Sequence, residues 1–268
     1  MPRVVAHVFV ADLARPVLDD GDAHHLARVL RLRPGEVVSV SDGRGGSRLC
    51  RWTGEAALEP FDGTATAAGV GVARGSGSGI VRDARPSPLL TVAFALTKGE
   101  HPEWAVQKLT ETGVDRVVVL ATERCVVRWA PSSQNRQLER LREIARLAAM
   151  QSRRSWLPAV EGVVAFGDLA GGGAGGGVGA GSGGRSGSVA LAVPGGTPLT
   201  LATPTVLVGP EGGWSDAELA AVPYHVGLGP HILRAETAAL AAGLLLVALR
   251  AGLVSPGSGH SSDTGARS

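Results

Sequence analysis

Residues 206–214, with the sequence VLVGPEGGW, decide the fold that we predict for this chain. The apolar residues 206–208 predict a buried strand, and a loop rich in glycine and proline follows it directly. Residues 215–218, Ser-Asp-Ala-Glu, have the pattern of a capping box, which predicts that a helix begins here. Because ligands bind at the carboxyl ends of strands in open parallel sheets, this loop is a candidate ligand-binding loop. A single tight turn of this kind is, by itself, more typical of an ordinary structural connection.

Residues 228–238, LGPHILRAETA, form a second segment of the same kind. A strand again ends in Gly-Pro, and Glu236 and Thr237 then stand at the head of an apolar helix. An acidic residue at a helix start complements the helix dipole, so Glu236 has a structural explanation, and Arg234 can be its ion-pair partner. Two such loops on neighbouring strands would nevertheless form one concave pocket lined by backbone amides and carbonyls.

Strands and helices alternate from residue 89 onward, which predicts an α/β fold with a mostly parallel sheet and helices on both faces. The strands expected from apolar runs span 89–96, 117–121, 189–193, 205–208 and 225–228, and the helices expected from the spacing of apolar residues span 102–112, 134–151 and 236–250.

The N-terminal part of the chain has short alternating apolar runs instead. Residues 37–40 and 49–53 flank the turn sequence DGRGG, which predicts a hairpin, and one short helix is expected at 22–30. We therefore predict a small β-barrel or sheet domain before the α/β domain. The predicted divisions are a β domain at 1–73, a linker at 74–88, an α/β domain at 89–253 with a disordered Gly-rich loop at 171–187, and a disordered tail at 254–268.

Charge and cysteine content restrict the class of protein. The formal charge is only +2, but the stretch from Arg124 to Arg154 holds an excess of arginine over its two acids, Glu139 and Glu143. This asymmetry fits phosphate neutralisation and fits a solvated helix face equally well. Cys50 and Cys125 lie far apart, so we expect free thiols in a reducing cytoplasm and no metal site. No apolar run approaches the roughly 20 residues that span a bilayer, so we expect no membrane segment.

The two Gly-Pro segments together resemble the signature of the 16S ribosomal RNA uridine-N3 methyltransferases, in the knotted SPOUT superfamily. The resemblance covers roughly residues 1–253, because further motifs of that family have counterparts along the chain. These are HLARVLR at 25–31, Thr97-Lys98-Gly99 with Gln107-Lys108, Glu111 and Gly113, Glu123-Arg124-Cys125, and Gln151 with Arg154.

The resemblance implies a PUA-like N-terminal β domain that helps to hold RNA, and a methyltransferase domain with a C-terminal trefoil knot. It also implies that S-adenosylmethionine binds in a bent conformation in the knot, with its adenine held mainly by backbone groups. The implied cofactor-binding residues are Val208, Gly209, Pro210, Glu211, Gly212, Leu228, Gly229, Leu233 and Thr237.

The reaction implied by the resemblance is methyl transfer to N3 of a uridine near the decoding centre of 16S rRNA. The N3 proton must leave, and a nearby cation would favour the resulting anionic base. We assign Arg234 to that role or to gripping phosphate. Glu236 is a candidate general base, and the structural explanation of this residue stays open beside it.

The expected RNA contacts are Arg28, Arg31, Lys98, Arg124, Gln151 and Arg154. Arg28 and Arg31 stand three residues apart, which would put them on one face of a short helix. The expected partners are 16S rRNA in the small ribosomal subunit and a second copy of the chain, and the expected location is the cytoplasm.

Three alternatives stand beside this interpretation. The first is a non-catalytic RNA-binding or ribosome-assembly factor on the same scaffold, and the second is a SPOUT methyltransferase that acts on another RNA site. The third, a Rossmann-type methyltransferase, requires a Gly-rich loop after the first strand. Leu96 is instead followed by Thr97-Lys98-Gly99-Glu100, which disfavours that fold.

Overall fold

The chain forms two compact units in a computed structural model that describes residues 2–63, 65–67, 70–73, 79–97, 99, 101–171 and 188–255. One unit combines residues 1–86 with 140–159, and the other combines 87–139 with 160–268. The predicted disordered segments at 171–187 and 254–268 fall outside the described residues, apart from Gly171, Val254 and Ser255.

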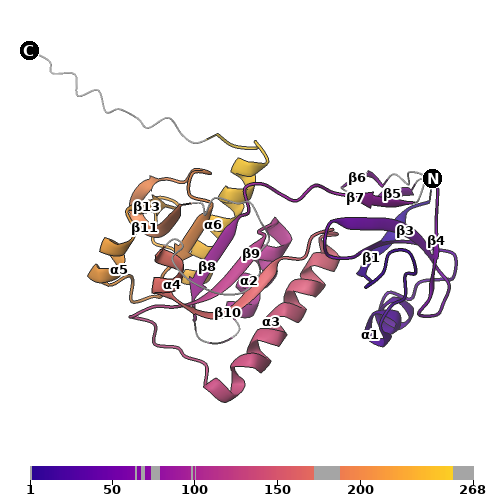
Figure 1. Cartoon of the computed structure of the whole chain (residues 1–268), viewed down its shortest axis with the longest axis horizontal. Coiled ribbons are helices and arrows are strands. Elements are labelled where there is room, and N and C mark those ends of the chain that lie inside the picture. The colour runs from indigo at the N-terminus through magenta and orange to yellow at the C-terminus, as the bar shows by residue number, and fades with distance from the viewer. Residues whose placement is uncertain are drawn as a thin grey trace, which may run out of the picture. The chain divides into compact units, whose positions relative to one another are not determined.

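The first unit is built on a five-stranded sheet in the order β1-β2-β3-β4, with β7 also paired to β3 (Figure 1). Strands β2 and β3 form the predicted hairpin, and its turn has left-handed glycines at Gly43 and Gly45. The strands are β1 (Val4–Phe9), β2 (Val37–Ser41), β3 (Gly46–Trp52), β4 (Leu58–Pro60) and β7 (Ile80–Arg82), and a separate antiparallel pair consists of β5 (Ala65–Ala67) and β6 (Val70–Ala73).

Strand β7 corrects the linker prediction for 74–88, because Ile80–Arg82 pair with Gly46–Arg48 in an antiparallel ladder. The closure of this sheet into a barrel stays a prediction.

The predicted helix at 22–30 has two parts. Helix α1 (Asp20–His24) is capped by Asp19, and it continues as a π-helical turn, η1 (His25–Val29). The expected shared face of Arg28 and Arg31 is wrong. The helical turn ends at Val29, and Arg31 lies beyond it with a left-handed backbone (φ 53°).

The long helix α3 (Pro131–Gln151) contributes its second half to the first unit. Ala149 and Met150 pack into the same apolar cluster as Leu26 and Trp52. Arg146 forms an ion pair with Asp22, which is almost fully buried. These contacts explain why 140–159 group with the β strands, although the sequence analysis assigns them to the α/β domain.

His7 ties β1 to the segment after α3. Its Nε2 lies 3.1 Å from the carbonyl oxygen of Arg154, and its Nδ1 lies 2.8 Å from Ser39 Oγ. Because a carbonyl can only accept, Nε2 carries the proton in the neutral ring, and Nδ1 accepts from the Ser39 hydroxyl. Burial lowers the pKa of His7 to about 4, so the ring is neutral in the folded protein at physiological pH.

We predict that His7 makes the folded protein acid-sensitive. The unfolded chain takes up a proton near pH 6.5, whereas the folded chain does so only near pH 4, so stability is lost as the pH falls through this window. The loss amounts to about 3 kcal/mol at its lower end. Urea unfolding between pH 7 and 4 measures it. His7→Gln should flatten this dependence, whereas His231→Gln, at an exposed position, should not. Equal pH slopes for the wild type and His7→Gln would contradict the assignment.

The second unit contains a six-stranded sheet in the order β10-β9-β8-β12-β11-β13 (Figure 1). The ladders of β9 with β8, β8 with β12, β12 with β11 and β11 with β13 are parallel, which confirms the predicted mostly parallel sheet. The strands are β8 (Thr91–Ala95), β9 (Arg116–Ala121), β10 (Ala159–Ala165), β11 (Val189–Pro198), β12 (Thr205–Val208) and β13 (Tyr224–Gly227).

Helices cover both faces of this sheet. On one face, α2 (His101–Thr112) packs against α6 (Ala235–Arg250), and α6 contacts β8 and β12. On the other face, Leu169 of α4 (Phe166–Ala170) and Leu219 of α5 (Asp216–Ala221) pack with Leu207 and Leu191 of the sheet. The α/β class predicted from the sequence is therefore confirmed, and the trefoil knot stays a prediction.

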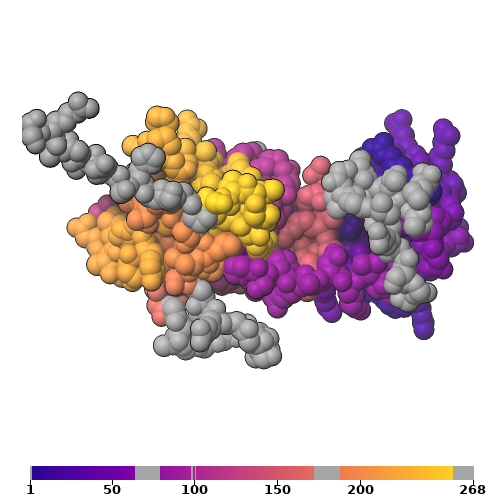
Figure 2. All heavy atoms as spheres, turned by 90° about the horizontal axis from the view of Figure 1, so that it is seen from above, coloured from indigo at the N-terminus to yellow at the C-terminus, as the bar shows by residue number. Residues whose placement is uncertain are grey.

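Helix α6 runs from the sheet to the molecular surface. Its end and the residues that follow it are the yellow atoms in Figure 2. Leu253, just after the helix, is 77% exposed. Near the middle of α6, Gly243 has no side chain to separate the helix from α2. A Cβ at this position would lie 2.5 Å from Leu109 Cδ2 and 3.0 Å from Val114 Cγ2.

Among the helices that the structure describes, none has both the length and the apolar character needed to cross a bilayer.

We predict that Gly243→Val lowers the free energy of unfolding by about 1–3 kcal/mol, because the new side chain must displace fully buried neighbours. Urea denaturation followed by circular dichroism measures the change. The matched control is Ala241→Val, at a half-buried position of the same helix. An unchanged unfolding midpoint for Gly243→Val would show that α2 and α6 are less closely packed than described.

Candidate functional site

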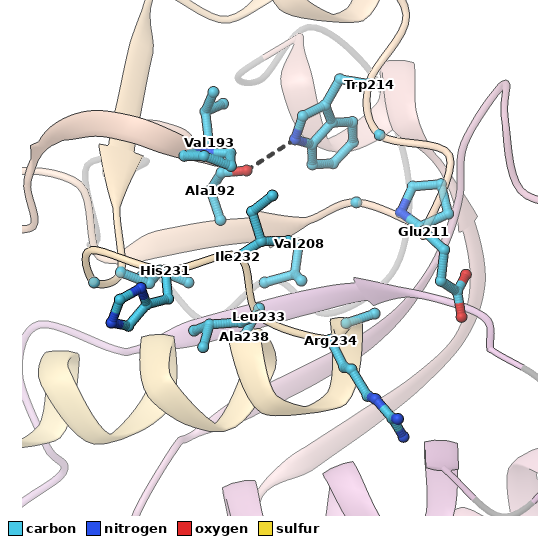
Figure 3. Close-up of a pocket in the computed structure, with 17 residues that line it drawn as sticks. Ala192, Val193, Val208, Glu211, Trp214, His231, Ile232, Leu233, Arg234 and Ala238 are labelled. Atoms are coloured by element: carbon cyan, nitrogen blue, oxygen red, sulfur yellow. Dashed lines mark hydrogen bonds between the residues drawn. The ribbon is translucent and has the colours of Figure 1, made fainter.

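A cavity of about 450 Å³ lies at the carboxyl ends of β12 and β13 and beside residues 192–194 of β11 (Figure 3). The parallel register places Val208, Ala192 and Val226 side by side, and the walls are formed by the loops after β12 and β13 together with residues 192–194 of β11. The lining residues are Ala192, Val193, Pro194, Val208, Gly209, Pro210, Glu211, Gly213, Trp214, Leu228, Gly229, His231, Ile232, Leu233, Arg234, Ala235 and Ala238.

The two Gly-Pro segments line one cavity, as expected, but the expectation of neighbouring strands is wrong, because β11 lies between β12 and β13 in the sheet. Of the predicted cofactor-binding residues, those that line it are Val208, Gly209, Pro210, Glu211, Leu228, Gly229 and Leu233. Gly212 and Thr237 are not among the lining residues. The sequence analysis missed the wall formed by Ala192–Pro194, because nothing in that stretch resembles a ligand-binding loop.

Trp214 closes the cavity on the side of β11. Its indole is nearly buried, and Nε1 donates to the carbonyl oxygen of Ala192 over 3.1 Å (Figure 3). The ring also contacts Phe166, with 5.7 Å between centroids. Gly209 permits this fold of the loop, since a Cβ there would lie 3.0 Å from the indole. The loop that follows β12 is therefore anchored to the next strand.

Glu218 fixes the other side of the same loop. The capping box predicted at 215–218 is present: Oε2 accepts from Ser215 N over 2.9 Å, and Glu218 N donates to Ser215 Oγ. The second carboxylate oxygen, Oε1, accepts from Glu123 N, also over 2.9 Å. This carboxylate is 6% exposed, so it joins the start of α5 to the loop after β9 inside the protein.

We predict that Glu218→Ala lowers the free energy of unfolding by about 3 kcal/mol, because it leaves two backbone N–H groups without their acceptor. Glu218→Gln keeps the shape and one acceptor, so it should lose less. Asp216→Ala, in the exposed first turn of the same helix, should cost under about 1 kcal/mol. Chemical denaturation ranks the three variants, and equal losses for Glu218→Ala and Asp216→Ala would contradict the bridging role.

Arg234 and Glu236 do not form the ion pair considered from the sequence. Arg234 is the exposed N-cap residue of α6 and lines the cavity, and its guanidinium has no hydrogen bond or ion pair within the described residues. Its side chain and that of Glu211 both extend away from Trp214 in Figure 3. Glu236 is not a lining residue, and its Oε1 lies 3.3 Å from Nδ1 of His101 in α2.

The predicted RNA contacts are distributed over both units. Arg28, Arg31 and Gln151 are exposed in the first unit, and Arg154 is half-buried there. Arg124 is exposed in the second unit, where its Nη1 lies 3.4 Å from the carbonyl oxygen of Gly212. Lys98 lies outside the described residues.

Several arginines of the basic stretch have structural partners. Arg146 pairs with Asp22, and Arg153 Nη2 donates to the carbonyl oxygen of Val4. Within the described ranges there is no cluster of three His, Cys, Asp or Glu residues that could hold a metal ion. Cys50 and Cys125 are free and buried, and burial raises the pKa of the Cys50 thiol to about 12.

Comparison with known proteins identifies the family. Residues 85–247 match the family model described as an RNA methyltransferase domain, and residues 18–55 match an RNA methyltransferase PUA domain. The chain is 34% identical to ribosomal RNA small subunit methyltransferase E of Mycobacterium bovis, over 89% of this chain and 90% of that protein.

Solved structures agree with this relationship. A probable rRNA-methyltransferase from Porphyromonas gingivalis superposes with a TM-score of 0.68 at 26% identity, over 93% of this chain and all of that one. The fold is also that of a ribosomal RNA small subunit methyltransferase E from Neisseria gonorrhoeae bound to S-adenosyl methionine, with a TM-score of 0.67 at 24% identity over 89% and 94% of the two chains. The chain is therefore an RNA methyltransferase of the ribosomal RNA small subunit methyltransferase E family.

Proposed function

We propose that the chain binds S-adenosylmethionine in the cavity formed by β11 and the loops after β12 and β13, and methylates N3 of a uridine in 16S rRNA. The observation that carries the proposal is the convergence of the two Gly-Pro loops on one cavity. The names of the relatives support rRNA as the substrate, and the Neisseria gonorrhoeae protein of the same fold is described with S-adenosyl methionine bound.

The lining residues fit this cofactor. Val208, Leu233 and Ala238 offer an apolar surface for the adenine ring, and the loops at 209–213 and 228–233 offer backbone N–H and C=O groups for its polar edge. Glycine at 229, where a Cβ would have no neighbour within 4 Å, leaves its backbone groups unobstructed. The cofactor supplies an electrophilic methyl group on a sulfonium. The role of the chain is to hold that group in line with the acceptor nitrogen.

Arg234 is the residue that we assign to the acceptor side. It lines the cavity and is exposed, and its guanidinium has no partner within the described residues. A cation in this position would stabilise the anionic uracil that forms when N3 loses its proton, or would hold the adjoining phosphate. The carboxylate of Glu236 already contacts the imidazole of His101 in α2. This contact supports a structural role for Glu236 more than a role as general base.

Membership of the same family also supports proposals about RNA contacts, location and oligomeric state. We propose that Arg28, Arg31, Lys98, Arg124, Gln151 and Arg154 contact 16S rRNA in the small ribosomal subunit, that the protein acts in the cytoplasm, and that it functions as a homodimer. A non-catalytic assembly factor on this scaffold is the competing assignment, and cofactor binding separates the two.

We predict that Arg234→Ala lowers the single-turnover rate of methyl transfer at least 100-fold and leaves cofactor affinity within about twofold, since the lost interaction acts on the reacting base. Arg234→Lys, which keeps a positive charge, should recover part of the rate. Quenched-flow transfer of a tritiated methyl group measures the rate, and calorimetry with S-adenosylhomocysteine measures affinity. A near-normal rate for Arg234→Ala would remove this residue from the reaction.

The substrate assignment is tested in the cell. Small-subunit rRNA from a strain lacking this gene, mapped by mass spectrometry, should lose a single methyluridine, which should return on complementation with the wild type. An unchanged modification map would contradict the proposed substrate.

A further inference from the structure

A second cavity, of about 280 Å³, lies beside the carboxyl ends of β8 and β9 and is unused by the function proposed so far. We call it the Trp129 cavity. Its lining residues include Thr122, Glu123, Cys125, Arg128, Trp129 and Gln134, and the whole lining belongs to the second unit. Strands β8, β9 and β10 lie side by side in the sheet at this point (Figure 1).

Thr122 provides a hydroxyl group that forms no hydrogen bond within the described residues. Thr122 is 5% exposed and is one of the lining residues, and its Oγ1 is buried. An unsatisfied buried hydroxyl costs free energy, so a ligand that bonds to it would remove this cost. The neighbouring Cys125 is already engaged, since its Sγ lies 3.1 Å from the carbonyl oxygen of Val127.

Trp129 and Arg128 define the chemistry of the ligand. Trp129 is half-buried in the wall and offers an aromatic surface, and Arg128 is an exposed cation without a partner in the described part of the chain. Proteins that recognise RNA by sequence stack splayed-out bases on aromatic side chains and bond to their polar edges, with arginine on the phosphates. The cavity is also slightly smaller than the roughly 300–1,000 Å³ of pockets for drug-sized ligands, which suits a single base.

The loop at 122–125 connects this cavity to the cofactor cavity. Arg124 Nη1 lies 3.4 Å from the carbonyl oxygen of Gly212, and Glu123 N is bound to Glu218. Gly212 stands between Glu211 and Gly213, which both line the cofactor cavity. The same loop therefore supplies walls to the Trp129 cavity and support to the loop at 209–213.

From this arrangement we propose that the Trp129 cavity receives an unstacked base of the RNA substrate. The base stacks on Trp129, its polar edge bonds to the Thr122 hydroxyl, and Arg128 holds the adjoining phosphate. This inference rests on the proposed function, because it takes rRNA as the substrate.

The test compares RNA-dependent and cofactor-dependent readouts on the full chain. Trp129→Ala should raise the small-subunit concentration for half-maximal methylation about tenfold or more, as loss of one base–aromatic stack does. Trp129→Phe, which keeps a flat ring, should restore most of the affinity. Thr122→Val, which keeps the shape, should raise the same concentration severalfold. The affinity for S-adenosylhomocysteine should stay within twofold in all three.

A matched pair of arginine variants tests the role of the positive charge at the cavity. Arg128→Ala should weaken binding of small subunits and make its salt dependence shallower, whereas Arg136→Ala, an exposed arginine of α3 that does not line the cavity, should change binding less. Wild-type binding for both Trp129→Ala and Thr122→Val would overturn the proposal.

Photocrosslinking locates the base directly. Small-subunit rRNA carrying 4-thiouridine should crosslink to the tryptic peptide 129–136, and crosslinks confined to other peptides would contradict a base in this cavity. If the wild type itself neither binds S-adenosylhomocysteine nor methylates small subunits, the proposed function fails. If the wild type is active and the Trp129→Ala and Thr122→Val variants bind small subunits as tightly as it does, the further inference alone fails.

Discussion

The parallel pairing of β12 between β8 and β11 is the constraint on which the rest of the second unit depends. Val208 lies opposite Phe94 on one side, and Leu207 lies opposite Leu191 on the other. Because these strands run in one direction, the loops that leave them emerge at one edge of the sheet. Both cavities lie along that edge, so strand direction alone brings segments distant in sequence to a common site.

Two side chains then hold the loops around the cavities in place through hydrogen bonds to backbone groups. Trp214 fixes the loop after β12 to β11 through the bond to Ala192, and the buried Glu218 carboxylate fixes the start of α5 to the loop after β9. Their partners are backbone groups, so the positions of the loops depend little on which side chains surround them. Arg234, by contrast, is left without a side-chain partner in the described structure, as the contact with substrate that we propose for it requires.

Much of the fold could be predicted from local patterns. Residues 206–208 and the capping box at 215–218 are local signals, and both have the expected structure. Strand β10 escaped prediction because it is an edge strand with mostly half-buried residues, including Glu161 and Gly162. The packing of Ala149 and Met150 with the first unit also escaped, because helical periodicity shows which face is apolar and not which core covers it.

The candidate site was predictable where backbone forms it, at 208–211 and 228–229, because glycine and proline mark such loops in any sequence. The contribution of Ala192–Pro194 and the pairing of Glu236 with His101 were not, since both depend on contacts between elements far apart in the chain. The Trp129 cavity was not predictable either, because its lining residues come from different elements. Thr122 follows β9, whereas Gln134 lies in α3.

The central claim is that the two Gly-Pro loops hold S-adenosylmethionine between them, and a crystal structure of the full chain grown with this cofactor tests it most directly. The account predicts density for the adenine against Val208, Leu233 and the backbone of 209–211. Density for the cofactor at another place in the chain, with this cavity left open at saturating concentration, would contradict it.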